Sequence, residues 1–507
     1  MSIAYERLAT PRRSLGILIE PHPHELLAAL RDAAAPQAAV LGRPARAWRA
    51  ELRQALGLGG PLVVTGHQAE FFHAGVFAKN IAADILAERA GAPAALFLLV
   101  DSDTPKTAHL ALPAHAAGEL RRATLSIPGC DPRLPVEFHA ASPEDWDRFF
   151  GEIRRHMAGA DLRVLDVLTS AWVAPTLADA LAVALPEIER GLGLRGARVV
   201  RVSRLSETAA FRAFAAHLLL NAEALAHAYN TAQVTFRLRH RLRNPSRPVP
   251  PLEVNQGAVE TPFWLINERG DRRRQRLFVR PTGGAIEVLA DRTPIALLER
   301  DHLADPAWHA APWPLAHAHW RLRPRALALS CFARLMLADL FIHGIGGAKY
   351  DEVTDDFAQR LFGEPLPPYA CVTATLHLPG ADAAAPSAVE IHRARRDLHW
   401  NPQRHLRTIP ADLAARRRQA VEASRRLRER SPSAHAARRG VFNEIRALNE
   451  QMLSVAAGER AELEKRLAAE ERRAAAARVA ADREYFFALH PRDALLALAA
   501  ALRSALS

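Results

Sequence analysis

PLVVTGHQAEFFHAGVFAKN, residues 61–80, contains an apolar run that stops at Thr65-Gly66 and is followed by two histidines, His67 and His73. A packed core does not need two histidines at such a position, whereas a site for a polar, anionic ligand uses them. The stretch therefore bears on the fold and the function together. The run before Gly66 predicts a strand, and the residues after His73 predict a helix.

The residues around this stretch predict a parallel sheet. Residues 62–65 form the first short buried strand, the helix from Val76 closes at Gly91, and ALFLLV at residues 95–100 is a second buried strand. Strand, helix and strand in this order form a βαβ unit. Both strands are continuously apolar, as expected for parallel strands that are covered on both faces.

The same alternation of strands and helices returns twice further along the chain. Residues 197–203 predict a strand, and Ser206 is expected to be the N-cap of a long helix after it. Residues 324–363 again combine an apolar run with a helical pattern. The fold class that we predict is therefore α/β.

The chain has 507 residues, which is too long for one ordinary core, and its composition changes along its length. We expect two inserted segments, the first short and β-like and the second an antiparallel β-segment rich in Pro, Arg and Trp. These insertions divide the core into three pieces, and a helical C-terminal region follows. In chain order the boundaries are 1–106 (core), 107–150 (first insertion), 151–229 (core), 230–320 (second insertion), 321–400 (core) and 401–507 (helical region).

The helical C-terminal region contains a heptad pattern. The apolar residues are spaced 4, 3, 4 and 3, namely Val441, Ile445, Leu448, Met452 and Val455. We expect two long helices that fold back at Gly458 into a coiled-coil hairpin. The hairpin can bury its seam internally, against the core or against a second copy of the chain, and we predict a homodimer. The final helix, after Pro491, is expected to dock onto the globular body.

Charge and cysteine content limit the functional classes. The net charge is +12, from 67 Lys+Arg against 55 Asp+Glu, which favours an anionic partner such as a nucleotide. Nucleic-acid binding is not favoured, because basic and acidic residues are mixed over most of the chain; an Arg-rich C-terminal surface for RNA is the weaker alternative. The three widely spaced cysteines indicate neither a disulfide framework nor a cysteine zinc site. We expect a cytoplasmic protein, since no signal core or membrane-spanning run is present.

Ligands of open parallel sheets bind outside the carboxyl ends of the strands. Two segments follow such ends, the turn from Gly66 to Gly75 and the acidic pair Asp101 and Asp103. A helix that begins near His73 would point its N–H groups and its positive end at a phosphate, and Gly75 would permit close approach. The alternatives are a turn histidine with a helix-packing glycine, and solvated loop acids.

Three other groups of residues can contribute to a site. The glycine-rich loop of Gly344, Gly346 and Gly347 with Lys349 can hold a phosphate, or it is a simple strand-to-helix turn. Glu260 and Trp264 suit an amino group or a sugar, or they belong to a β-hairpin core. The acids after Lys349 are candidates for Mg²⁺, although such residues more often cap a first helical turn; they are Asp351, Glu352, Asp355 and Asp356.

The pattern His73-Ala-Gly75-Val76 is similar to the HIGH tetrapeptide of class I aminoacyl-tRNA synthetases and nucleotidylyltransferases. In its wider context the stretch resembles the bacillithiol-biosynthesis cysteine-adding enzyme family, in which TGQQ-x-G-L-F-x-G-P-x-Y-x-x-x-K precedes an apolar strand with an acidic end. HGIGGAKYDEVTDDFAQRLFG at residues 343–363 is similar to the Gly-rich segment of that family. The matching positions of the first motif are Thr65, Gly66, Gln68, Phe72, Gly75 and Lys79, whereas His67 replaces the first family glutamine.

The resemblance implies a Rossmann-like core of the HUP type, with two inserted connecting segments and a C-terminal helical hairpin that dimerises. It also implies a ligase that joins cysteine, or another amino acid, to an amine acceptor with ATP or another nucleotide; Mg²⁺ is a candidate cofactor. The alternative is a non-catalytic nucleotide-binding or scaffold protein that retains the fold. For the ligase we assign catalysis to His67, His73, Asp101 and Asp103, substrate binding to Glu260 and Trp264, and nucleotide binding to Gly66, Gln68, Gly75, Gly344, Gly346, Gly347 and Lys349.

Overall fold

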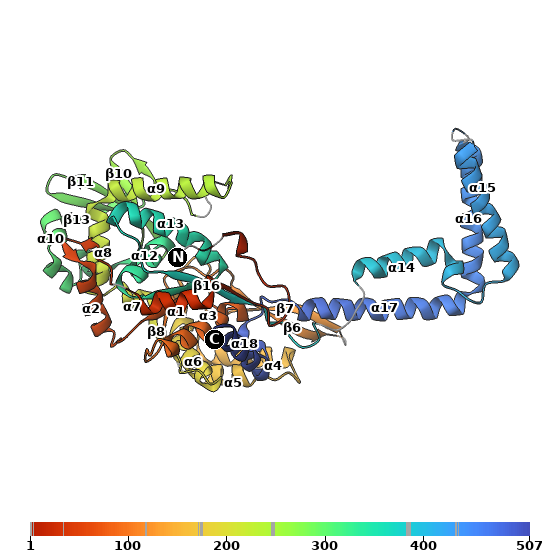
Figure 1. Cartoon of the computed structure of the whole chain (residues 1–507), viewed down its shortest axis with the longest axis horizontal. Coiled ribbons are helices and arrows are strands. Elements are labelled where there is room, and N and C mark those ends of the chain that lie inside the picture. The colour runs from red at the N-terminus through yellow and green to blue at the C-terminus, as the bar shows by residue number, and fades with distance from the viewer. Residues whose placement is uncertain are drawn as a thin grey trace. The chain divides into compact units, whose positions relative to one another are not determined.

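The computed structural model describes residues 3, 5–33, 35–116, 119–170, 172, 176–244, 249–381, 387–430, 433 and 435–507 (Figure 1). The chain divides into two compact units. The first consists of Met1–Leu112, Ala123–His377 and Arg483–Ser507, and the second of Pro113–Arg122 and Leu378–Asp482. The larger segment of the second unit begins at Leu378, whereas the predicted helical region begins at residue 401, and the final helix belongs to the first unit.

A six-stranded sheet forms the centre of the first unit, and its strand order is β1-β16-β15-β4-β5-β8. Five strands are parallel and β1 is antiparallel to β16, so the predicted parallel sheet is confirmed. The chain leaves β4 toward β5 and β8, and later returns to the other side of β4 with β15 and β16. The strands are β1 (Ile17–Glu20), β4 (Val63–Gln68), β5 (Leu96–Val100), β8 (Arg198–Arg201), β15 (Leu340–His343) and β16 (Tyr369–Ala374).

Helices cover both faces of this sheet, which explains why its strands are continuously apolar. Val64, Leu96 and Phe341 belong to one hydrophobic cluster with residues of α2, α8, α12 and α13. α3 packs on β4, β15 and β16, and the final helix α18 packs on α3. The bounds are α2 (Ala45–Ala55), α3 (Ala74–Arg89), α8 (Ala209–Leu220), α12 (Ala326–Met336), α13 (Ile345–Phe362) and α18 (Arg492–Ala505).

The second inserted segment forms the predicted antiparallel sheet, in the order β13-β12-β11-β10-β14, with β9 also paired to β10. The pairing of β10 with β11 shifts its register between Glu260 and Trp264. The strands are β9 (Val254–Asn255), β10 (Ala258–Asn267), β11 (Arg274–Thr282), β12 (Ala285–Ala290), β13 (Thr293–Glu299) and β14 (Trp320–Pro324). The first inserted segment contains a hairpin of β6 (His109–Ala116) and β7 (Glu119–Ser126).

The remaining elements of the first unit connect these two sheets. The helices are α1 (Pro23–Arg31), α4 (Pro143–His156), α5 (Arg163–Ser170), α6 (Leu177–Gly191), α7 (Val202–Leu205), α9 (Ala222–Arg239), α10 (Arg300–Ala304) and α11 (Pro314–His317). The short pieces are β2 (Ala39–Val40), β3 (Arg43–Pro44), η1 (Tyr5–Arg7), η2 (Val136–Phe138), η3 (Pro306–Ala310) and η5 (Phe487–Leu489). No helix of the described residues is long and apolar enough to cross a membrane.

One helix start differs from the prediction. Ser206 was expected to cap the long helix after β8, but its hydroxyl donates to Val202 O at 2.7 Å and so closes the short helix α7. Thr208 caps α8 instead, because its hydroxyl accepts from Phe211 N at 3.3 Å. The predicted end of α3 is confirmed, since Gly91 directly follows the helix with a φ of +69°.

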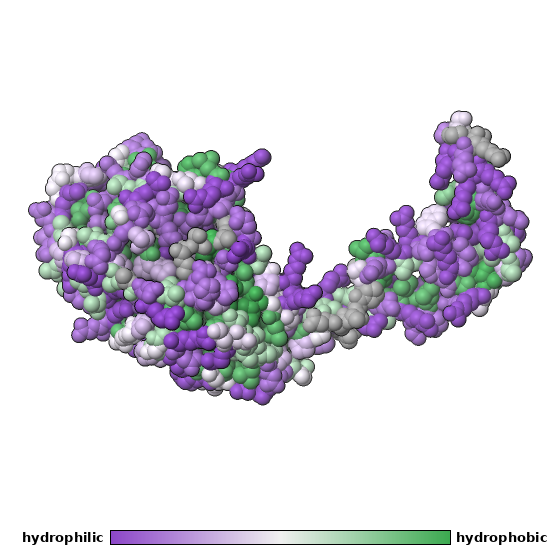
Figure 2. All heavy atoms as spheres, viewed as in Figure 1, coloured by the Kyte–Doolittle hydropathy of each residue, from purple (hydrophilic) through white to green (hydrophobic). Residues whose placement is uncertain are grey.

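The second unit is mainly helical, and Figure 2 shows hydrophilic side chains over most of the visible face of its helices. A hairpin is present, but the predicted fold-back at Gly458 is wrong. Leu448 and Met452 pack against Leu413 and Ala420 of α15, and Gly458 lies in the first turn of α17. The helices are α14 (Ala388–Trp400), α15 (Ala411–Arg430), α16 (His435–Val455) and α17 (Ala457–Ala480), with the short η4 (Pro402–Arg404).

This packing changes the expectation for the heptad seam. Its central residues are buried within one chain by α15, whereas Val455 at its end is 58% exposed. A second copy of the chain is therefore not required to cover the seam. The homodimer stays a prediction.

Candidate functional site

The order of the strands reverses between β4 and β15, and open α/β sheets bind ligands at such a point, outside the carboxyl ends of the strands. β4 ends in Gly66, His67 and Gln68, and β15 ends in His343 just before Gly344. Gly66, His67 and Gln68 still pair with β5, so the turn that was predicted to start at Gly66 begins only after Gln68. This turn and the glycine-rich loop lie at the same edge of the sheet. We call this place the switch point.

Lys79 of α3 places its ammonium group at the switch point. Its Nζ donates to Gly66 O at 2.6 Å, and the side chain is 3% exposed. Burial, and then repulsion by Lys106, lower the pKa of Lys79 from 10.5 to about 7. Within the described residues, Gly66 O is the single hydrogen-bond partner of Nζ, and no carboxylate is close enough to form an ion pair. Such a group gains an interaction when an anion enters.

The glycine-rich loop meets Lys79 from β15. A Cβ atom on Gly344 would lie 3.8 Å from Cδ of Lys79, and a Cβ atom on Gly346 would meet open space. At Gly347 the glycine is needed for packing within the protein, because a Cβ atom there would collide with the His343 ring. Gly344 is the N-cap of α13, so the first N–H groups of a long helix begin beside the lysine.

Cys371 of β16 links the two lysines of this region. Burial raises the pKa of its thiol to about 12, and the positive charges of Lys79 and Lys349 oppose that rise. Both lysines are therefore close enough to the thiol to act on it. The switch point thus combines Lys79 with the start of α13, an arrangement that suits an anion, while the charges of Lys349 and of the opposing Glu20 act on the same thiol.

The two histidines of the opening stretch are both partly buried and neutral. Nδ1 of His67 lies 3.2 Å from Gln68 O, and burial lowers the pKa of His67 well below 6.5. Nδ1 of His73 accepts a hydrogen bond from Gly75 N at 3.0 Å, and burial lowers the pKa of His73 to about 3. His73 is thereby the N-cap of α3, a structural role that needs an unprotonated Nδ1.

The N-terminus of α3 faces other parts of the protein. A Cβ atom on Gly75 would collide with Ala374 O and with the Arg483 guanidinium. Phe487 N also donates to Phe72 O at 3.0 Å, so the segment before α18 lies across the helix start. The close approach that Gly75 permits is therefore an approach of β16 and the C-terminal segment.

The two predicted aspartates have different surroundings. Asp101 is fully buried, and it accepts from Arg201 Nε at 2.7 Å, Ser203 N at 2.8 Å and Ser203 Oγ at 2.5 Å. Asp103 is more accessible, and it accepts from the Gln68 amide at 2.5 Å and pairs with Arg274. Asp101 thus fixes its neighbours, whereas Asp103 remains at the rim of the site.

Two arginines connect the predicted substrate residues to this rim. The guanidinium of Arg274 lies 4.8 Å from the centre of the Trp264 ring, and that of Arg325 lies at the same distance. Arg325 also pairs with Glu260 at 2.5 Å. The structure therefore brings Gln68, Asp103, Trp264 and Glu260 into one connected group. Arg274 and Arg325 were not predicted as site residues, because arginine is common in this chain; Arg325 does lie in LRPRAL, residues 322–327, which resembles an LLRP segment of the cysteine-adding enzyme family.

The acids of α13 are engaged with cations. Asp351 pairs with Arg334 and His343 at 2.8 and 2.9 Å, and Asp355 pairs with Arg334 at 2.7 Å. Glu352 pairs with Arg239 and His240, and Asp356 with Arg360. Over the described ranges, no group of three or more His, Cys, Asp or Glu residues is arranged to hold a metal ion. The four acids that were candidates for Mg²⁺ therefore have protein partners.

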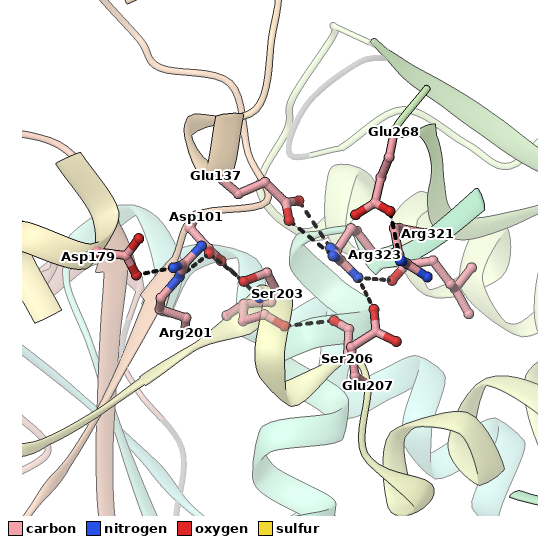
Figure 3. A network of polar contacts seen from close by, with 12 residues as sticks. Asp101, Glu137, Asp179, Arg201, Ser203, Ser206, Glu207, Glu268, Arg321 and Arg323 are labelled. Atoms are coloured by element: carbon pink, nitrogen blue, oxygen red, sulfur yellow. Dashed lines mark hydrogen bonds and ion pairs between the residues drawn. The ribbon is translucent and has the colours of Figure 1, made fainter. Parts of the chain in front are cut away.

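A pocket that sequence reasoning missed lies beyond β8, in the same unit (Figure 3). Its volume is about 500 Å³. Arg201 ends β8 and also holds Asp101, so the pocket is continuous with the carboxyl edge of the sheet. Its charged lining consists of Arg201, Arg204, Arg321, Arg323, Glu137, Glu207 and Glu268. These residues come from four separate segments, so no local spacing indicated them.

Neither the models of known protein families nor the curated proteins include a match to this chain. The resemblance to the cysteine-adding enzymes therefore depends on its motifs. The parallel sheet with its reversed strand order, the lysine at the switch point and the pocket beyond β8 are observations on this chain alone. The arrangement can hold an anion at the switch point and a polar molecule beside it.

Proposed function

We propose that the protein is a nucleotide-dependent ligase of the cysteine-adding type, with a HUP-type core, and that the nucleotide phosphates bind at the switch point. The observation that carries the proposal is Lys79, a buried ammonium group whose single described hydrogen-bond partner is Gly66 O. A buried cation without a carboxylate partner is costly for the fold and suits an anionic ligand.

The proposed roles follow from the positions of the groups. Lys79 and the N–H groups at the start of α13 bind phosphate oxygens, and Lys349 adds positive charge from the same helix. Gln68 and Asp103 lie at the ends of neighbouring strands. The amide of Gln68 and the carboxylate of Asp103 orient the amine acceptor. Activation of a carboxylate by adenylation depends mainly on such positioning and on stabilisation of developing charge. His67 and His73 are neutral here, so they act by hydrogen bonding and packing.

The test is binding followed by turnover. Isothermal titration of the full chain with ATP should show binding, and Lys79→Met should weaken it by roughly tenfold or more, as expected for loss of a charge-assisted hydrogen bond. Lys465→Met is the matched control, since Lys465 is exposed and lies in the second unit. ATP binding that is equal in all three proteins would remove the switch point from the proposal.

The alternative is a protein that binds a nucleotide without catalysis. The saturated hydrogen bonding of Asp101 favours this alternative, because one of the acids expected to act on the amine is occupied. Mass spectrometry after incubation with ATP, cysteine and a panel of primary amines separates the two. An amide product and AMP or ADP support the ligase, whereas bound but unchanged ATP supports the alternative.

A further inference from the structure

The pocket beyond β8 has a floor whose charges are already paired. Arg323 is 3% exposed, and its guanidinium donates to both carboxylate oxygens of Glu137 at 3.0 Å and to Oε1 of Glu207 at 2.8 Å. Figure 3 shows the two glutamates meeting this guanidinium. Arg201 is fixed in the same way by Asp101 and Asp179. The floor is therefore rigid and has little charge left to offer.

The rim differs from the floor, because its charged groups retain unused hydrogen-bonding atoms. Within the described residues, the exposed guanidinium of Arg204 makes neither a hydrogen bond nor an ion pair. Glu207 uses only Oε1, and Glu268 meets Arg321 through Oε2 at 2.7 Å. Oε2 of Glu207 and Oε1 of Glu268 therefore remain open to a ligand. The N–H donors of Arg204, and the donors of Arg321 that do not meet Glu268, also remain open to a ligand.

This mixture of open donors and acceptors excludes ligands of a single sign. Four arginines and three glutamates line the pocket, so a free phosphate would meet carboxylates and a simple amine would meet guanidinium groups. A neutral sugar usually stacks on an aromatic ring. Phe138, the aromatic side chain from η2 in the lining, already has the Arg272 guanidinium over its ring at 5.5 Å.

We propose that this pocket binds a small zwitterion, a free amino acid or a dipeptide, with its carboxylate on Arg204 and Arg321 and its ammonium on Glu207 and Glu268. Charge-assisted hydrogen bonds are the strong ones, and a zwitterion forms them with both kinds of rim group at once. The volume of about 500 Å³ lies within the range of small-molecule sites. The pocket assignment does not depend on nucleotide binding at the switch point.

The experiment is a titration of the full chain by calorimetry with the twenty amino acids, diglycine and dialanine. Acetate, methylammonium and glucose are the single-feature probes. At least one zwitterion should bind, and at least about tenfold more tightly than acetate or methylammonium, because each of those can use only one half of the rim. Binding of amino acids without dipeptides, or the reverse, identifies the source of the zwitterion.

Three variants locate the binding. Arg204→Ala and Glu207→Gln change rim groups that are exposed, so the fold should survive, and each should weaken the zwitterion about tenfold or more. Arg12→Ala changes an exposed arginine outside the pocket and should leave the affinity unchanged. ATP binding should be the same in all three, which separates a failure here from a failure at the switch point.

Three results would overturn the assignment. The first is that none of these zwitterions binds at millimolar concentration. The second is that glucose binds and the zwitterions do not, which would make the pocket a sugar site. The third is zwitterion binding that Arg204→Ala and Glu207→Gln leave intact, which would place the ligand elsewhere.

Discussion

Replacement of Lys79 by methionine should make the empty protein more stable at neutral pH. Lys79 is buried, with Nζ on Gly66 O and no carboxylate within ion-pair distance in the described residues. In the unfolded chain the pKa of this amine is about 10.5, and in the folded protein it is about 7. Between pH 7 and pH 10.5 the Lys79 amine is therefore protonated in the unfolded chain and neutral in the folded protein. The parent therefore gains stability as the pH rises from 7 to 10.5.

The size of the effect follows from this difference. A shift from 10.5 to about 7 corresponds to about 5 kcal/mol of destabilisation, which is fully present below pH 7. Methionine has a similar length and no charge, but it leaves Gly66 O without its donor, at a cost of about 1–3 kcal/mol. Lys79→Met should thus be more stable than the parent by about 2–4 kcal/mol at pH 7. At pH 10.5 the advantage should be gone, because the amine is then neutral in the folded state and only half protonated in the unfolded state, so little of the penalty remains.

The assay is urea denaturation of parent and variant, followed by circular dichroism, at several values between about pH 7 and pH 10.5. Most other groups titrate alike in both proteins, so the difference between the two curves reports on Lys79 and on the Cys371 thiol, whose pKa is raised by burial and lowered by the charge of Lys79. Lys465→Met, at an exposed position, should show no such difference. If Lys79→Met is less stable than the parent at every pH, with no change of the difference with pH, the amine is satisfied in the empty site and the reasoning fails.

Four other outcomes are expected. Burial raises the pKa of Glu189 to about 7, so the parent should lose about 3 kcal/mol between pH 4.5 and pH 7; Glu189→Gln should remove this loss, as measured by denaturation across that range. Arg334→Met should destabilise the first unit by about 3–5 kcal/mol in the same measurement, since it leaves the buried Asp351 carboxylate with only His343 and the Ser330 hydroxyl as partners. Gly75→Ala should cost about 1–3 kcal/mol in thermal unfolding, because its Cβ atom meets backbone at Ala374. Light scattering of the full chain should show the predicted dimer, and a protein lacking α15 and α16 should be a monomer; an unchanged monomer would end that prediction.

Much of the core was predictable because its signals are local. Continuous apolar runs marked β4 and β5, and Gly91 marked the end of α3. The parallel direction followed from the helix between two strands. The order of the strands was not predictable in the same way, because it depends on where β15 returns to the sheet after two insertions.

The helical unit shows a different limit. The spacing from Val441 to Val455 correctly indicated a helix with an apolar seam. The spacing alone does not show which helix packs against that seam. Leu413 and Ala420 of α15 cover it, and α15 has few apolar residues among its arginines. The local pattern favoured α17, which contains Gly458, as the partner of this seam. In the structure the partner is α15, which ends at Arg430.

The site was predictable in place and less so in detail. The carboxyl edge of the sheet follows from the βαβ unit, and it does carry Gly66, Gln68, Asp103 and the glycine-rich loop. Burial of His73 and saturation of Asp101 depend on the C-terminal segment and on Arg201, which are distant in sequence. Lys79 lies one helical turn after Gly75, and its burial can be seen only when β15 and β16 are in place.

The backbone of Leu378 donates to Ala480 O at 3.0 Å, so the chain enters and leaves the helical unit at nearly the same point. The segment from Leu378 to Ala480 therefore behaves as one long loop whose two ends are held together. The contact between its ends does not depend on the structure of the residues between them. If a short turn joined His377 to Arg483 in place of this segment, the same two ends would be connected at a smaller entropic cost of loop closure. The segment from Leu378 to Ala480 is in this sense a module that can be shortened or exchanged without refolding the central sheet, on which α3 with Lys79 packs.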